Sequence, residues 1–222
     1  MASEEWQAVD RYFEDLLLPA DPALAAALQE SDAAGLPAIS VSPAHGKLLM
    51  MLAMLTDAKR ILEIGTLGGY STIWLARGLS AGGKVISLEI DPHHAEVARR
   101  NVERAGLGGR VEIRVGRALD TLPKLAAEKA GPVDLAFIDA DKGGNAEYLA
   151  WALKMSRKGS VIVIDNVVRN GAVADPKSRD GSVLGSRKVT EMIAAEPRLA
   201  ATAIQTVGSK GYDGFAIAIV VS

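Results

Sequence analysis

Acidic side chains follow two neighbouring apolar segments of the chain, at the point where each segment turns polar. Asp139 closes the apolar run that begins at residue 133, and Asp165 closes the run that begins at residue 160. If the two runs are adjacent parallel strands, their carboxylates lie roughly 5 Å apart at the carboxyl edge of a sheet. Asn166 adds an amide oxygen directly after Asp165. Because this donor set contains only oxygen, we expect Asp139, Asp165 and Asn166 to bind Mg²⁺, Mn²⁺ or Ca²⁺.

Lys142 follows Asp139 by three residues, and we expect it to act as a general base, with Asp139 beside it in the catalytic site. Three protein ligands leave coordination positions for water and for a substrate that carries two adjacent hydroxyls, one of which the cation would polarise. A simpler interpretation is that each Asp ends a strand or caps the next helix. That interpretation explains either acid alone better than it explains the pair together with Asn166 and Lys142.

A glycine-rich turn, residues 63–71, follows an earlier apolar segment. Gly65 allows a tight turn and a close approach of the backbone to a ligand. Glu89 ends the next apolar segment, 24 residues beyond Gly65, where nucleoside-binding sheets place a carboxylate on the ribose hydroxyls. The turn lacks the G-x-G-x-x-G spacing, and Glu63 would repel a phosphate but attract an ammonium group. S-adenosylmethionine carries an ammonium group and no phosphate, so we expect this nucleoside cofactor rather than an ordinary βα turn.

The elements that position these residues alternate along the chain. Near-continuous apolar runs are typical of parallel strands covered on both faces, and segments with helical periodicity separate them. The expected strands are residues 60–64, 84–89, 111–115, 133–139 and 160–165, and the expected helices between them lie near 71–79, 92–105, 119–129 and 145–155.

The two ends of the chain depart from this alternation. After a helix near 187–195, the apolar segments 201–207 and 215–221 have no crossover helix between them, so we expect them to pair antiparallel. Residues 1–40 contain short helical segments and form an expected N-terminal helical extension. The sequence therefore predicts one domain over residues 1–222, with an α/β, doubly wound, Rossmann-like sheet of seven strands that ends in an antiparallel hairpin.

Composition narrows the class of protein. The 222 residues carry a formal net charge of −2 and include no cysteine. Disulfides, thiolate metal sites and a thiol nucleophile are thereby excluded, and the charge does not suit a nucleic-acid-binding protein. The acidic first residues do not resemble a signal peptide, and no apolar run reaches the length of a membrane span. We therefore expect a cytoplasmic protein that binds neither nucleic acid nor a membrane.

Three segments, residues 63–71, 137–142 and 165–166, resemble the metal-dependent O-methyltransferases, which include animal catechol O-methyltransferase, plant caffeoyl-CoA O-methyltransferase and small bacterial enzymes. The resemblance spans about residues 35–221 and implies a class I methyltransferase fold. It also implies methyl transfer from S-adenosylmethionine to a hydroxyl of a catechol-like small molecule held by a divalent cation. Asp141 makes the chain similar to the plant and bacterial branch, which is commonly dimeric, so a homodimer is expected.

The same resemblance implies roles for individual residues. Asp139, Asp165 and Asn166 match the metal ligands of the family, and Lys142 matches its base. The positions that match cofactor-binding positions are Val41, Glu63, Gly65, Thr66, Ser71, Glu89, Arg117, Ala118 and Asp139.

Two functions of other classes stay open. A nicotinamide-dependent oxidoreductase could use the same sheet, although the dinucleotide signature and a second catalytic domain are missing. A non-catalytic protein that binds a nucleoside cofactor would not need Lys142 and the metal set. The sequence does not name the methyl acceptor; the polar segment 167–186 is expected to be a long irregular connection, either a substrate lid or a surface loop. We assign His45 to the start of a helix that begins at Ser42.

Overall fold

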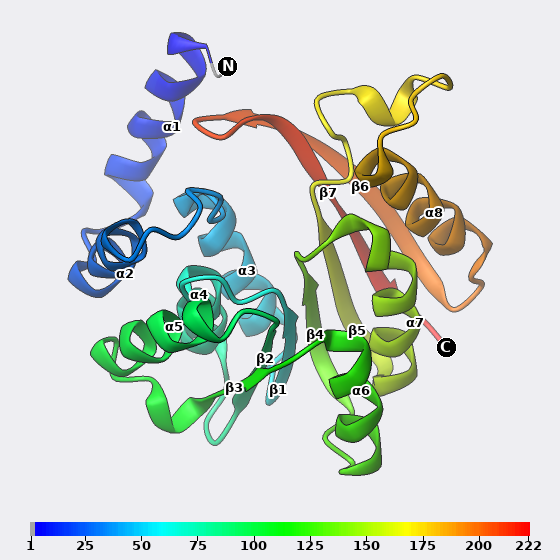
Figure 1. Ribbon diagram of the computed structural model, residues 1–222, viewed down its shortest axis with the longest axis horizontal. Helices are drawn as coiled ribbons and strands as arrows, with labels where there is room; N and C mark the ends of the chain where they lie inside the picture. The colour runs from blue at the N-terminus through cyan, green and yellow to red at the C-terminus, as the bar shows by residue number, and fades with distance from the viewer. Residues whose placement is uncertain (1–2) are drawn as a thin grey trace.

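The computed structural model describes residues 3–222, in which one seven-stranded mixed sheet lies between two layers of helices (Figure 1). The strand order is β3-β2-β1-β4-β5-β7-β6; β1 to β5 run parallel, and β7 is antiparallel to both β5 and β6. The predicted fold class is therefore confirmed. The strands are β1 (Arg60–Ile64), β2 (Lys84–Glu89), β3 (Val111–Val115), β4 (Val133–Ile138), β5 (Ser156–Asp165), β6 (Leu199–Gly208) and β7 (Gly211–Val220).

Each face of the sheet is covered by its own set of helices. On one face lie α2 (Pro22–Ala33), α3 (Pro43–Leu55), α4 (Tyr70–Gly78) and α5 (Pro92–Arg104). On the other face lie α6 (Ala118–Ala127), α7 (Asn145–Met155) and α8 (Gly181–Ala195). Short 3-10 turns, η1 (Gly108–Arg110), η2 (Lys142–Gly144) and η3 (Ala172–Ala174), lie in the connections.

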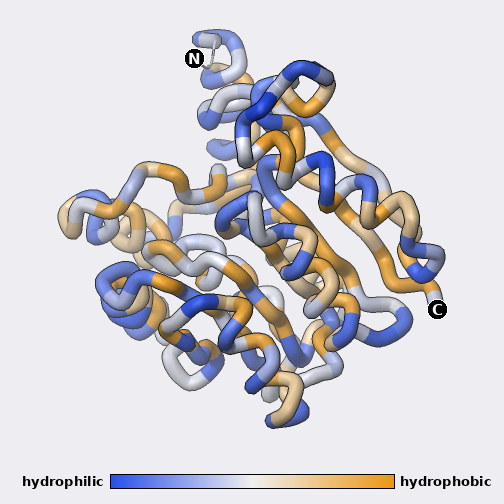
Figure 2. The backbone as a smooth tube through the Cα atoms, turned by 45° about the vertical axis from the view of Figure 1, so that its right-hand side comes forward, coloured by the Kyte–Doolittle hydropathy of each residue, from blue (hydrophilic) through white to orange (hydrophobic). Residues whose placement is uncertain are grey.

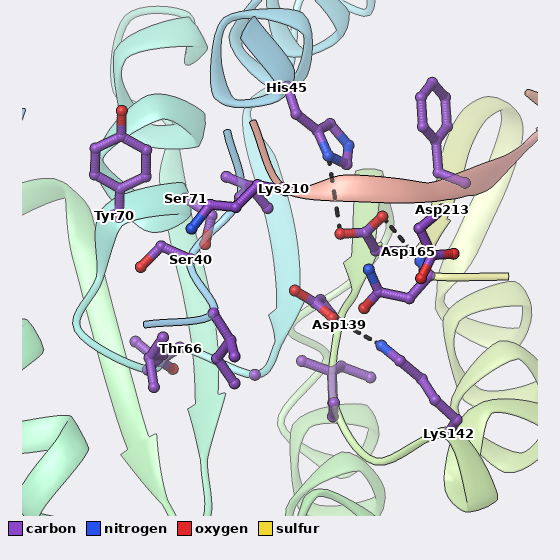
Figure 3. A pocket seen from close by; sticks show the side chains of 18 of the residues that line it. Ser40, His45, Thr66, Tyr70, Ser71, Asp139, Lys142, Asp165, Lys210 and Asp213 are labelled. Atoms are coloured by element: carbon purple, nitrogen blue, oxygen red, sulfur yellow. Dashed lines mark hydrogen bonds and ion pairs between the residues drawn. The ribbon is translucent and has the colours of Figure 1, made fainter. Parts of the chain in front are cut away.

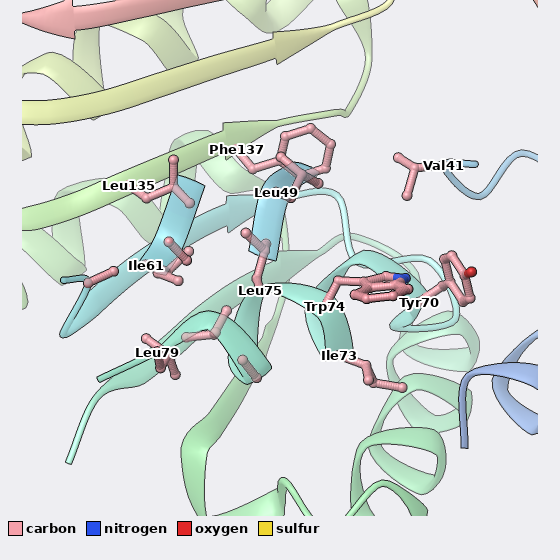
Figure 4. Packing of buried hydrophobic residues seen from close by; sticks show 14 of the residues in the cluster. Val41, Leu49, Ile61, Tyr70, Ile73, Trp74, Leu75, Leu79, Leu135 and Phe137 are labelled. Atoms are coloured by element: carbon pink, nitrogen blue, oxygen red, sulfur yellow. The ribbon is translucent and has the colours of Figure 1, made fainter. Parts of the chain in front are cut away.

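The central strands owe their apolar character to burial on both faces. In β1, Ile61 packs with the cluster of α3 and α4, whereas Leu62 and Ile64 pack with the cluster of α6 and α7. Figure 2 shows the hydrophobic stretches of the backbone concentrated along the middle of the sheet. In Figure 4, Leu49 of α3 lies near Phe137 of β4 and Leu75 of α4. This rigid core fixes the carboxyl edge of the sheet, where the predicted site residues lie.

The C-terminal part differs from the sequence expectation in two places. The hairpin strands extend to a two-residue turn, Ser209 and Lys210, where a longer loop was expected. Glycines near the turn suggest a loop, yet a side chain at Gly214 would lie only 2.2 Å from the carbonyl oxygen of Ile204, so a glycine is required inside this strand pair. Helix α8 begins at Gly181, six residues before the expected start at Arg187. Asp180 starts it by accepting the backbone N–H groups of two α8 residues.

The N-terminal helices differ in how they join the fold. In α2, Leu24, Ala27 and Ser31 are buried, and the Asn101 side chain of α5 donates to the carbonyl oxygen of Ala27 at 3.3 Å. Helix α1 (Glu4–Leu17) has no buried residue and lies beside the β6–β7 hairpin (Figure 1). Across residues 3–222, no helix combines the length and the apolar character that a membrane span requires.

Candidate active site

A cavity of about 1280 Å³ opens at the carboxyl edge of the sheet and brings the predicted site residues together. One side of it is lined by the turn after β1, the end of β2 and the start of α6; the other side is lined by the ends of β4 and β5. Figure 3 shows side chains from both sides facing the same space. The predicted residues that line the cavity are Val41, Gly65, Thr66, Ser71, Glu89, Arg117, Ala118, Asp139, Lys142, Asp165 and Asn166.

Gly65 connects the two sides of the cavity. Its φ of +101° is in the region that favours glycine. A side chain at this position would lie 2.1 Å from the backbone carbonyl oxygen of Asp139. Gly65 therefore lets the end of β1 lie directly against the end of β4, and this contact fixes the backbone from which the Asp139 side chain projects.

Glu89 shapes the turn that follows β1. One of its carboxylate oxygens accepts the backbone N–H groups of Thr66 and Leu67, at 3.1 and 2.8 Å. The other oxygen accepts the backbone N–H of Asp91 at 2.9 Å. A carboxylate has about four lone-pair positions, so the oxygen that faces Asp91 retains capacity for a ligand hydroxyl. Glu89 thus both orders the glycine-rich turn and presents an acceptor to the cavity.

Glu63 is the one predicted cofactor-binding residue that the structure places behind the cavity wall. Its side chain is 0% exposed and accepts the hydroxyls of Ser71 and Ser87, each at 2.6 Å, and that of Thr72. Burial raises the pKa of Glu63 to about 7, although the three hydroxyl donors favour the charged form. Because Ser71 lines the cavity, Glu63 reaches the site through Ser71 rather than directly.

The predicted metal ligands meet at the ends of β4 and β5. Ile138 pairs with Ile164 in the parallel register, so the residues that follow them, Asp139 and Asp165, lie on adjacent strands at the same edge. Burial, followed by the negative charge of Asp139, holds the pKa of Asp165 well above its usual range. Asn166 has a φ of +55°, a conformation that asparagine tolerates better than most residues, and this turns the chain at the site.

Lys142 points from η2 into the same cluster. Its Nζ donates to Oδ1 of Asp139 at 2.8 Å, and its side chain is only 8% exposed. The backbone of Lys142 is held from the far side by α8, because a side chain at Gly185 would lie 2.1 Å from the Lys142 carbonyl oxygen. Gly185 therefore permits a close helix contact that sets the position of the lysine.

His45 is a cavity residue that sequence reasoning assigned only to a helix start. Its Nδ1 lies 3.8 Å from Oδ2 of Asp165, and its ring stacks on Phe215 with centroids 5.0 Å apart. Burial lowers the pKa of His45, against the opposing effect of the Asp139 charge. The signal that could have revealed His45 is its place four residues after Val41, in a segment that the resemblance already put over the cofactor.

The segment after Asn166 is more ordered than expected. It contains η3, and Arg187 Nε donates to the carbonyl oxygen of Val173 at 2.8 Å, which ties η3 to α8. Arg169 and Ser182 line the cavity, so the segment contributes to its wall. The prediction of a long irregular connection over residues 167–186 is therefore wrong for residues 181–186, which belong to α8; a role as a substrate lid stays a prediction.

Within the described part of the chain, no three His, Cys, Asp or Glu side chains form a metal-type cluster. The candidate cation site consists of two carboxylates and the Asn166 amide, the set expected from the sequence. These residues fit a hard cation, because the buried Asp165 carboxylate has another carboxylate as a neighbour and all three side chains offer oxygen.

Comparison with known proteins decides the family. Residues 20–216 match the model of the O-methyltransferase family. The chain belongs to this family. The resemblance inferred from the sequence is thereby confirmed, as is the expectation that the protein is an O-methyltransferase enzyme, and the two alternative functions lose their support.

Relatives and solved structures agree with the O-methyltransferase assignment. The chain is 55% identical over 212 residues to the catechol O-methyltransferase of Mycobacterium tuberculosis, with 96% of this chain and 94% of the relative covered. It is 52% identical to the catechol O-methyltransferase of Niastella koreensis, over 99% of this chain and 100% of the relative. The O-methyltransferase of Bacillus cereus, solved in complex with SAH, shares 58% identity and a TM-score of 0.96, with 98% and 99% of the two chains covered.

Proposed function

We propose that this O-methyltransferase transfers the methyl group of S-adenosylmethionine to one hydroxyl of a catechol-like small molecule held by a divalent cation. The observation that carries the proposal is the pair Asp139 and Asp165, two carboxylates side by side at the edge of the cavity with a raised pKa on Asp165. The names of the two relatives, each called catechol O-methyltransferase, support the substrate class. The SAH bound to the Bacillus cereus enzyme supports the cofactor.

The cofactor would occupy the side of the cavity formed by the glycine-rich turn. Glu89 has acceptor capacity for the ribose hydroxyls, and Arg117 and Ala118, at the start of α6, line the same side for the adenine. Val41 and Ser71, together with the backbone of Gly65 and Thr66, would surround the amino-acid tail. We reassign Glu63 from direct contact to a positioning role, since its three hydroxyl partners include Ser71.

Asp139, Asp165 and Asn166 would hold the cation, for which Mg²⁺ is proposed and Mn²⁺ or Ca²⁺ would also suit the oxygen donors. When bound, the cation supplies Lewis acidity that favours the ionised form of a substrate hydroxyl. Lys142 Nζ contacts Asp139 as an ammonium; with a cation bound to that carboxylate, the lysine in its neutral amine form would be placed to take the hydroxyl proton. The substrate oxygen forms a bond to the methyl carbon as the carbon–sulfur bond breaks, and the sulfur leaves as a neutral thioether.

His45 and Phe215 would form an apolar and aromatic wall next to this cation site. A flat aromatic substrate can pack against such a wall while its two oxygens point toward the carboxylates.

A substrate comparison tests the proposal. Catechol and 3,4-dihydroxybenzoate should be methylated in the presence of Mg²⁺, with one added methyl group detected by mass spectrometry. Phenol and 4-hydroxybenzoate, which have one hydroxyl each, should react at least about 100-fold more slowly, since they cannot occupy two cation positions. Equal rates for the two groups of compounds would contradict a substrate held through adjacent hydroxyls.

We also propose that the enzyme is a homodimer in which α1 is covered by a second copy. The apolar side chains of α1 support this, because Tyr12 is 62% exposed, Leu16 65% and Leu17 63%, an arrangement that an isolated chain would leave in water. Light scattering after size exclusion should give twice the chain mass. A Leu16→Glu, Leu17→Glu double variant should give the chain mass, whereas a wild-type protein of chain mass would contradict the dimer.

A further inference from the structure

Lys210, at the tip of the β6–β7 hairpin, lines the cavity but takes no part in the proposed methyl transfer. It belongs to the two-residue turn between Gly208 and Gly211, and the whole tip lines the cavity together with Asp10 of α1. The hairpin therefore carries a cationic side chain, from the far end of the sequence, across to the site built by the central strands.

Two contacts fix the position of the tip. Oδ2 of Asp10 accepts the backbone N–H of Ser209 at 2.6 Å, which joins the turn to α1. Lys210 Nζ donates to the carbonyl oxygen of Ala38 at 3.4 Å, which joins the turn to the segment before α3. In Figure 3, the Lys210 side chain extends toward the side of the cavity that holds Ser40 and Ser71 and away from Lys142.

The charge of Lys210 is not matched by an acid in the structure. The other lysine and arginine side chains of the cavity wall each form an ion pair: Lys142 with Asp139 at 2.8 Å, Arg169 with Asp213 at 3.7 Å and Arg117 with Asp120 at 3.9 Å. Within residues 3–222, no carboxylate forms such a pair with Lys210. An ammonium group has three donors, and the single, long bond to Ala38 leaves two of them available.

We propose that Lys210 binds a carboxylate inside the cavity, and that this carboxylate belongs to the amino-acid tail of the cofactor. The inference rests on the proposed function, because Ser71, one of the residues that would surround the tail, lies on the side that Lys210 faces (Figure 3). A charge-assisted hydrogen bond between ammonium and carboxylate is stronger than the bond to the Ala38 carbonyl that it would replace or share. A carboxylate on the substrate offers the same chemistry and is the second source to be tested.

The consequence is that the hairpin and α1 take part in cofactor binding. Asp10 holds the turn, the turn presents Lys210, and Lys210 would hold the end of the cofactor opposite the adenine. An interaction between charged groups near the cavity mouth is weakened by salt. Added salt should therefore weaken binding of the cofactor more than binding of a ligand that lacks the amino-acid tail.

Calorimetry with two ligands tests the assignment. S-adenosylhomocysteine and 5′-methylthioadenosine share the nucleoside and the sulfur, but only the first has the amino-acid tail. We expect Lys210→Met to weaken S-adenosylhomocysteine binding about tenfold and to leave methylthioadenosine binding unchanged. Lys210→Arg should keep most of the affinity, and the matched control Lys177→Met, which changes an exposed lysine outside the cavity wall, should leave both ligands unaffected.

A kinetic arm separates the two sources of the carboxylate. If the carboxylate comes from the substrate, Lys210→Met should raise the KM for 3,4-dihydroxybenzoate and not that for catechol, with both calorimetric affinities unchanged; this would support carboxylate binding but move it to the substrate. Equal weakening of both nucleoside ligands, or no change in either arm, would overturn the inference. A wild-type enzyme that fails to bind S-adenosylhomocysteine would instead contradict the proposed function, so the two failures are distinguishable.

Discussion

The two sides of the cavity treat their carboxylates differently. On the cofactor side, Glu63 accepts three hydroxyls and Glu89 accepts three backbone N–H groups, so the protein itself provides donors for each charge. On the other side, Asp165 is buried next to Asp139 and accepts one backbone N–H, that of Asn166 at 2.9 Å, and the one lysine present contacts Asp139. A carboxylate that accepts several hydrogen bonds from the protein is stabilised by the fold and shapes the cavity. A buried carboxylate next to another carboxylate is repelled by it, and a bound cation would stabilise both charges.

Removal of the Asp165 carboxylate should have the largest effect on turnover. Asp165→Ala takes away one of only two charged ligands, so turnover should fall by at least about 100-fold, whereas S-adenosylhomocysteine affinity should stay within about twofold. Steady-state kinetics and calorimetry measure the two quantities. Asp175→Ala, at an exposed acid beyond the cavity wall, is the matched control. Normal turnover in Asp165→Ala would contradict the division of roles.

The cofactor side should show the opposite pattern. Glu89→Ala removes an acceptor for the ribose and for the N–H groups of the turn, so S-adenosylhomocysteine binding should weaken by about 1.5–3 kcal/mol, the range for hydrogen bonds to a charged group. At saturating cofactor, the metal dependence of turnover should stay near normal. Unchanged affinity by calorimetry would remove Glu89 from the cofactor site.

A smaller effect on turnover is expected at Gly185, where a backbone contact positions Lys142. Gly185→Ala places a methyl group 2.1 Å from the Lys142 carbonyl oxygen, so η2 or α8 must shift. We expect kcat to fall by about tenfold with little change in cofactor affinity, because a small displacement of a catalytic group has effects of this size or larger. Gly181→Ala, in the same helix with no atom within 4 Å, is the matched control. Equal kcat values for the two variants would show that this contact does not position Lys142.

Glu63 should affect the pH dependence of stability, because it lies behind the cavity wall. Folding raises the pKa of Glu63 from 4.5 to about 7, so the folded state keeps a proton that the unfolded state releases between these pH values. The contribution of Glu63 to stability is therefore greatest below pH 4.5 and falls as the pH rises to about 7, by at most about 1.4 kcal/mol per pH unit. Urea unfolding of Glu63→Gln should show a shallower decline over this range than the wild type. Identical slopes would mean that Glu63 is charged in the folded protein.

The parts that the sequence predicts well are those fixed by local pattern. Continuous apolar runs identify β1 and β4 because these strands are buried on both faces, and the polar residues at the ends of β4 and β2 identify Asp139 and Glu89. Long-range packing decides the parts that were missed. Gly185 and Gly214 resemble loop residues in the sequence. In the structure, Gly185 of α8 lies against the Lys142 backbone and Gly214 of β7 lies against the Ile204 backbone, and each close contact requires a glycine.

The same limit applies to the site residues. His45 and Lys210 come from elements whose position in the fold depends on tertiary contacts, so no local motif marks them as cavity residues. Glu63 shows the reverse case. Its place in the motif predicts contact with the cofactor, but whether the side chain reaches the cavity or turns behind it depends on the hydroxyls of α4 and β2 that surround it.

Methyl transfer should need a cation on the Asp139 side of the cavity, whereas cofactor binding on the Glu89 side should not. Treatment with EDTA, with removal of metal verified by elemental analysis, allows both quantities to be measured on one preparation. We predict that catechol methylation is lost, that S-adenosylhomocysteine binds with nearly unchanged affinity, and that Mg²⁺ or Mn²⁺ restores turnover. Full methylation by the verified metal-free enzyme would contradict a substrate held by a cation.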